Sequence, residues 1–79
     1  MKKPATKTKN EIGDNLRKLR YQHGFTQETF SARCGTLGLD ISRGTLSKIE
    51  ARLRCVSDSE LRILAKALHV KMDDLFKGL

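Results

Sequence analysis

One short pattern recurs four times along the chain and constrains its fold more than any other feature of the sequence. An apolar residue precedes a residue at a capping position, and a second apolar residue follows four positions after the cap, which is the hydrophobic-staple spacing of a helix N-terminus. The four instances are Phe25-Thr26 with Phe30, Ile41-Ser42 with Leu46, Val56-Ser57 with Leu61, and Val70-Lys71 with Leu75. Ser57 and Glu60 also form a capping box, whereas Lys71 is a poor cap. The pattern predicts four helix starts.

A further helix is predicted before these four. It begins near Thr8 or Asn10, either of which can cap it, and Glu11 completes a capping box for Thr8. Gly24 ends it. In the first four helices, apolar residues at helical spacing predict buried stripes. The stripes are Ile12, Leu16 and Leu19; Phe30, Cys34 and Leu37; Leu46, Ile49 and Leu53; and Leu61, Leu64, Ala65 and Leu68. Because the sequence has no β-branched alternation and no Asn-Gly hairpin signal, the predicted fold class is all-α, with five short helices.

Length and composition bound the possibilities further. A chain of 79 residues with 38% hydrophobic content suffices for one domain with a modest core. No apolar run approaches the roughly 18 residues needed to cross a bilayer, and no signal-peptide stretch follows the Lys-rich start. We therefore expect a soluble, cytoplasmic protein. The two cysteines, Cys34 and Cys55, have no neighbouring Cys or His at zinc-ligand spacing, so we expect reduced structural thiols and no metal site.

The charge balance favours a polyanionic partner. Sixteen basic residues against nine acidic ones give a net charge of +7, which suits either nucleic acid or an anionic membrane surface. Four of the basic residues lie in the first nine positions, with Pro4 and two threonines, and predict a flexible basic arm over residues 1–9. They are Lys2, Lys3, Lys7 and Lys9. The remaining domain, residues 10–79, has 12 basic and nine acidic residues, a net charge of only +3.

The sequence also resembles the Cro/C1-type helix-turn-helix family, also called the XRE family. The resemblance runs from about Ile12 to Phe76, in the family order and with nearly the family spacings. Its strongest segments are IGDNLRKLR (12–20), FTQET (25–29), ISRGTLSKIE (41–50) and LRILAKALHV (61–70). About five additional residues, Thr36 to Asp40, separate the second and third helices. We interpret them as an extension of the second helix through Leu37, stopped at Gly38, and a turn before Ser42.

The resemblance implies a five-helix Cro/repressor-like domain, with a lengthened second helix and turn, that binds double-stranded DNA in a sequence-specific manner. The implied role is transcription regulation, with repression favoured over activation. The third helix, about residues 43–51, is expected to enter the major groove. With Leu46 and Ile49 turned inward, the residues facing outward are the expected base contacts: Arg43, Gly44, Ser47 and Lys48. Arg43 is the first choice because its guanidinium can hold guanine O6 and N7 bidentately.

Contacts to the DNA backbone are expected from both sides of the third helix. The start of the second helix offers unpaired N–H groups and a positive dipole end, and the resemblance assigns Gln27 both to phosphate and to bracing the first base reader. The expected backbone contacts are Thr26, Gln27, Ser42, Thr45, Arg52 and Arg54. Ordinary solvated charges remain the alternative for the arginines and Lys48. The resemblance also implies an internal salt bridge between Arg20 and Glu50.

Several functions compete with DNA binding. An antitoxin-like or adaptor module that binds a partner protein is the main alternative. We expect that the protein is not an enzyme, because the sequence has neither a metal-ligand cluster nor a Gly-rich phosphate loop. His23 and His69 lie at predicted helix ends without a neighbouring nucleophile. We likewise expect no cofactor and no membrane role. A homodimer on palindromic DNA is expected, with Phe76 and Leu79 as candidate dimer contacts and Leu75 assigned to the core.

Overall fold

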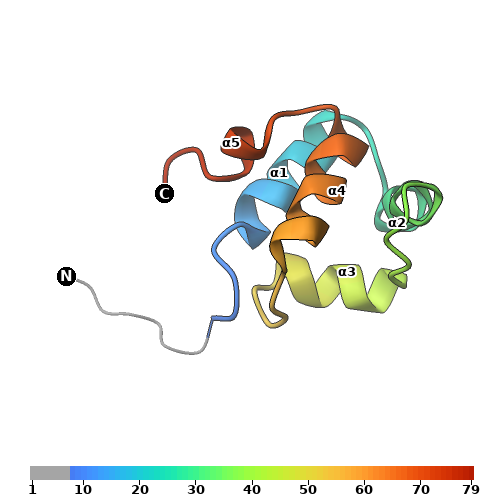
Figure 1. Ribbon diagram of the computed structural model, residues 1–79, viewed down its shortest axis with the longest axis horizontal. Helices are drawn as coiled ribbons and strands as arrows, with labels where there is room; N and C mark the ends of the chain where they lie inside the picture. Colours follow the sequence, from blue (N-terminus) through green and yellow to red (C-terminus); the bar gives the residue numbers. More distant parts are fainter. Residues whose placement is uncertain (1–7) are drawn as a thin grey trace.

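The computed structural model describes residues 8–79, and this part of the chain is all-helical, as the sequence predicts (Figure 1). The helices are α1 (Gly13–Gln22), α2 (Gln27–Thr36), α3 (Arg43–Glu50), α4 (Asp58–Leu68) and α5 (Met72–Leu75). α3 ends one residue before the predicted limit. Among the described residues, no helix is long and apolar enough to cross a membrane. Most of the predicted arm, residues 1–7, lies outside the described residues.

The caps predicted from the staple pattern begin three of these helices. The side chains of Thr26, Ser42 and Ser57 each accept a hydrogen bond from the backbone N–H three positions later, at 3.0, 3.1 and 3.2 Å. Glu60 Oε1 accepts from the Ser57 N–H at 3.0 Å and completes the predicted capping box. At α5 the expected weakness of Lys71 is confirmed, since its side chain caps nothing.

The predicted start of the first helix is wrong in its position, although one of the two predicted capping side chains, Asn10, does bind the helix end. α1 begins at Gly13, and neither Thr8 nor Asn10 is its N-cap; Glu11 completes no capping box. Asn10 instead satisfies the helix end from outside, because its Oδ1 accepts hydrogen bonds from the N–H groups of Ile12 and Gly13 at 3.1 and 2.9 Å. The Asn10 amide nitrogen donates to the carbonyls of Ile49 and Arg54 at 3.1 and 2.8 Å. One side chain therefore ties the start of α1 to the end of α3.

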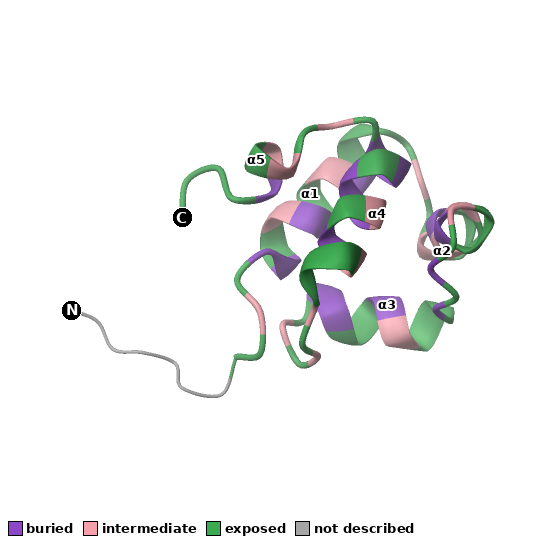
Figure 2. Ribbon diagram, viewed as in Figure 1, coloured by how far each residue is buried: buried purple, intermediate pink, exposed green. Residues whose placement is uncertain are grey.

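The helices enclose one core (Figure 2). Its largest fully buried side chains are Ile12, Leu16, Phe30, Cys34, Leu46, Ile49, Leu64, Leu68 and Leu75. Leu75 is completely buried, as expected, and closes the core at α5. Leu53 is the exception among the predicted stripes: it is 62% exposed, because α3 ends at Glu50 and the chain turns through Arg52, whose φ is +65°.

The additional residues between α2 and α3 extend the helix and then return the chain to the core. α2 continues to Thr36 with Leu37 as its C-cap, and Gly38 follows with φ +102°, a left-handed conformation that favours glycine. This confirms the interpretation made from the sequence. Leu39 and Ile41 are both buried, so the connection is packed rather than looped out.

Both cysteines are free thiols, as predicted. Cys34 lies in the core, and burial raises the pKa of its thiol to about 11. Cys55 is exposed on the connection between α3 and α4. The expectation of two structural thiols is therefore correct for Cys34 and wrong for Cys55, whose side chain is accessible.

Candidate nucleic-acid interface

The outer face of α3 is exposed while its inner face is fixed in the core. Leu46 and Ile49 are completely buried, and Thr45 lies half-buried at the edge. The residues that the sequence predicts as base contacts are all exposed on the outer face: Arg43, Gly44, Ser47 and Lys48. Ser42 and Thr45 are joined through the cap, with Ser42 Oγ donating to Thr45 Oγ1 at 3.1 Å. The face is therefore short, polar and held at a fixed angle.

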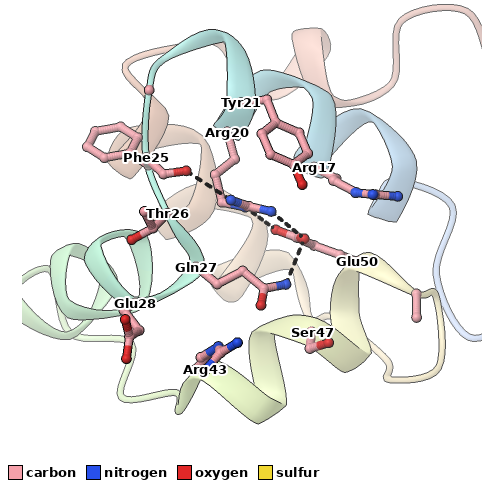
Figure 3. A pocket seen from close by; sticks show the side chains of 12 residues that line it. Arg17, Arg20, Tyr21, Phe25, Thr26, Gln27, Glu28, Arg43, Ser47 and Glu50 are labelled. Atoms are coloured by element: carbon pink, nitrogen blue, oxygen red, sulfur yellow. Dashed lines mark hydrogen bonds and ion pairs between the residues drawn. The ribbon is translucent and has the colours of Figure 1, made fainter.

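A buried ion pair holds the end of α3 against α1. Arg20 and Glu50 are 3% and 5% exposed and make a bidentate contact, with Nε to Oε2 at 2.6 Å and Nη2 to Oε1 at 3.0 Å (Figure 3). Hydrogen bonding to Glu50 raises the pKa of Arg20 above its ordinary value, against the opposing effect of burial. This is the pair that the family resemblance implies.

The same ion pair also forms hydrogen bonds with residues at the start of α2 and just before it. Arg20 Nη1 donates to the Phe25 carbonyl at 2.9 Å, and Gln27 Nε2 donates to Glu50 Oε1 at 3.1 Å (Figure 3). Every buried nitrogen and oxygen atom of the two charged groups therefore has a hydrogen-bond partner within the protein. α1, α2 and α3 are locked into one arrangement, and the outer face of α3 cannot tilt without breaking this network.

Side chains from the three helices line a single open hollow above this network (Figure 3). α1 contributes Arg17 and Tyr21, α2 contributes Gln27, and α3 contributes Arg43 and Ser47. Four of the predicted contacts, Thr26 and Gln27 at the start of α2 and Arg43 and Ser47 on α3, thus share one continuous surface. Lys48 and Gly44 belong to the exposed face of α3 without lining the hollow.

The two arginines after α3 are engaged within the protein. Arg52 Nε donates to the Asn10 carbonyl at 3.1 Å, and its Nη1 lies 3.9 Å from Asp14 Oδ2. Arg54 pairs with Glu60 at 3.1 Å and lowers the pKa of that carboxyl group. Both arginines keep about one third of their side chain exposed. They remain accessible to a ligand but already have partners.

Two residues that line the hollow, Arg17 and Tyr21, are not among the contacts predicted from the sequence. They lie four positions apart on α1, next to the buried residues Leu16 and Arg20, and so flank the predicted core stripe. That spacing places two side chains on the same helix face and was the only available signal. Nothing in the sequence indicated that this face adjoins α3.

Comparison with known proteins decides the family. A family model described as helix-turn-helix matches residues 16–75, well over half of the chain. The chain belongs to the helix-turn-helix family. The resemblance to its Cro/C1-type members is thereby confirmed, and membership supports DNA-binding transcription regulation as the class of function.

Two solved structures are similar to this helix-turn-helix protein. The restriction-modification controller protein C.AhdI from Aeromonas hydrophila has a TM-score of 0.73 and 32% sequence identity, covering 82% of this chain and 87% of that chain. The hypothetical transcription factor NHTF from Neisseria has a TM-score of 0.70 and 26% identity, covering 81% of this chain and 68% of that chain. No curated protein matches the sequence.

Proposed function

We propose that this protein binds double-stranded DNA sequence-specifically, inserts α3 into the major groove, and represses transcription. The observation that carries the proposal is the outer face of α3, which is exposed and polar while Leu46, Ile49 and the Arg20–Glu50 pair hold the helix in place. A major groove about 12 Å wide admits one α-helix of about 10–12 Å diameter. A helix fixed in this way can present the same side chains to every duplex.

The exposed residues of α3 suit base reading in different ways. Arg43 supplies a planar guanidinium that matches O6 and N7 of guanine. Gly44 lets the helix approach the base edges closely, and the fold does not require glycine there, because an added Cβ would meet only Ser42 Oγ at 3.7 Å. Ser47 and Lys48 follow on the same face and can reach a base or a phosphate.

The start of α2 supports backbone contacts beside this face. Its first-turn N–H groups and dipole favour an anion, and Thr26 and Gln27 lie at this end. Gln27 donates one N–H of its amide group to Glu50, which fixes the side chain in the bracing position. Its second amide N–H can donate to a phosphate oxygen. We assign further backbone contacts to Ser42, Thr45, Arg52 and Arg54. The positive charge of the Lys-rich arm adds nonspecific affinity for DNA. Lys9, the last residue of the arm, donates its backbone N–H to the Arg52 carbonyl and so lies beside the end of α3.

A homodimer on two half-sites about one helical turn apart completes the proposal. Phe76 and Leu79, near the C-terminus, are 40% and 67% exposed and provide an apolar contact that Leu75 cannot, because it is buried. Palindromic target sites are the direct consequence of a two-fold symmetric dimer.

Selection of bound duplexes from a random DNA pool tests the proposal, followed by affinity measurements with wild type, Arg43→Ala and the control Arg62→Ala. Arg62 is exposed on α4 and does not line the hollow. We expect an enriched, two-fold symmetric motif, and Arg43→Ala should lose about 1–3 kcal/mol on it with relaxed preference at one base position. An equal loss on all sequences assigns Arg43 to the backbone. With no motif, the antitoxin-like or adaptor function replaces sequence reading.

A further inference from the structure

Arg17 and Tyr21 form a basic and aromatic pair on the outer face of α1. The Arg17 guanidinium carbon lies 5.6 Å from the centre of the Tyr21 ring, and the Tyr21 residue is 61% exposed. Tyr21 is therefore not part of the hydrophobic core. The hydrogen bonds of the buried network that fixes α3 involve neither Arg17 nor Tyr21, and Tyr21 meets that network only where Arg20 lies over its ring. The fold therefore leaves the function of this pair unassigned.

The ring of Tyr21 is nevertheless held in place. The buried Arg20 guanidinium carbon lies 4.6 Å from the ring centre, within cation–π distance, and Arg20 is itself immobilised by Glu50 and the Phe25 carbonyl. A ring stacked on a fixed guanidinium loses little rotational freedom when its hydroxyl binds a ligand. The hydroxyl group of Tyr21 is thus a preorganised donor at the surface.

The charges around this hydroxyl favour an anion. Hydrogen bonding from Arg17, and then from Arg20, lowers the pKa of the Tyr21 phenol, because both cations stabilise negative charge at its oxygen. Among residues 8–79, no carboxylate lies within ion-pair distance of Arg17. The remaining charged side chains lining the hollow are Arg43 on α3, Glu28 on α2 and the neutralised Arg20–Glu50 pair.

The hollow places this pair next to the proposed base-reading face. Arg17 and Tyr21 line the same concavity as Gln27, Arg43 and Ser47 (Figure 3). A helix that fills a major groove leaves its flanking helices over the phosphates at the edge of that groove. We propose that Arg17 and Tyr21 form a phosphate-binding subsite that receives the DNA backbone beside α3, an inference that rests on the proposed function.

The test compares wild type, Arg17→Ala and Tyr21→Phe on the selected duplex and on a nonspecific duplex over a range of salt concentrations. Lys18→Ala is the matched control, because Lys18 is exposed on the same helix and does not line the hollow. Arg17→Ala should lower affinity roughly threefold to tenfold on both duplexes and reduce the salt slope by about one. Tyr21→Phe keeps the ring and should lose roughly threefold from the missing hydroxyl donor. The control should lose less than either.

Duplexes with single neutral methylphosphonates locate the contact. Wild type should lose affinity at a phosphate bordering the groove, and Arg17→Ala should show no further loss at that position. The subsite is overturned if Arg17→Ala and Tyr21→Phe keep the wild-type affinity, salt slope and methylphosphonate pattern. In that case, a loss of affinity for the selected duplex in Arg43→Ala would still uphold the proposed function. If no base preference is found but Arg17→Ala lowers the salt slope on both duplexes, the phosphate-binding subsite is upheld and sequence-specific recognition is not.

Discussion

Removing both partners of the Arg20–Glu50 pair should destabilise the protein by less than the sum of the two single removals. Both groups are almost fully buried, and the pair makes two short contacts of 2.6 and 3.0 Å. In Arg20→Met the Glu50 carboxylate stays buried with only the Gln27 amide as a partner. In Glu50→Gln the guanidinium stays buried without a counter-charge. Each single substitution leaves a buried charge uncompensated and should cost about 3–5 kcal/mol.

The double variant Arg20→Met/Glu50→Gln has no buried charge left, so it should cost much less than the sum of the two single variants. We expect a coupling free energy of about 2–3 kcal/mol, within the range for residues that share one network. Small domains have a total stability of only about 5–15 kcal/mol, so either single variant should lower the unfolding midpoint strongly.

Urea unfolding followed by circular dichroism at about 15 °C measures all four proteins, with Arg62→Met as a control for the loss of a surface arginine. The slope against urea should stay constant, so that midpoints report stability alone. Single costs below about 1 kcal/mol that add within about 0.5 kcal/mol in the double variant would refute the reasoning, because they would mean that the two charges do not depend on each other.

Further predictions concern local contacts. Gly13→Ala should lower the free energy of unfolding by about 1–3 kcal/mol, measured in urea, because the added Cβ would lie 2.6 Å from the Ile49 carbonyl oxygen. Gly44→Ala should leave the free energy of unfolding unchanged or slightly raised and should weaken DNA binding instead. Glu60→Gln should reduce the free energy of unfolding at pH 7. Because the pKa of Glu60 is lowered in the fold from its ordinary 4.5, that difference should shrink as the pH falls below 4.5, and a difference independent of pH would contradict the assignment. A thiol reagent at pH 8 should modify Cys55 rapidly and Cys34 only on unfolding, since burial raises the pKa of Cys34 to about 11; equal rates would count against this.

Helix starts were predictable from sequence where one local interaction determines them. Thr26, Ser42 and Ser57 each cap the helix that their spacing predicts, because the cap and staple involve residues only a few positions apart. The start of α1 was not predictable in this way. Asn10 satisfies its N–H groups from outside the helix while its amide bonds to two carbonyls about 40 residues away, and such partners are absent from a local pattern.

The apolar stripe of α3 shows a related limit. Leu53 has the right spacing to follow Leu46 and Ile49, but the helix ends before it and the chain turns through Arg52 with positive φ. Spacing predicts burial only while the helix continues. The predicted stripe therefore included one residue that the structure places at the surface.

The candidate interface was predictable in part. The exposed residues of α3 follow from helical periodicity once Leu46 and Ile49 are assigned to the core. The Arg20–Glu50 pair came from the family resemblance, since two charges 30 positions apart carry no pairing signal of their own. The Arg17–Tyr21 pair depends on how α1 packs beside α3, which only the three-dimensional arrangement shows.

Methylation interference on the selected duplex tests the central claim most directly, because methylation of guanine N7 blocks the major groove at a single base. If α3 reads the major groove through Arg43, N7 methylation of one guanine in each half-site should abolish binding by wild type, and Arg43→Ala should become insensitive to that same guanine. Interference confined to minor-groove positions, or an identical guanine pattern for wild type and Arg43→Ala, would contradict the account.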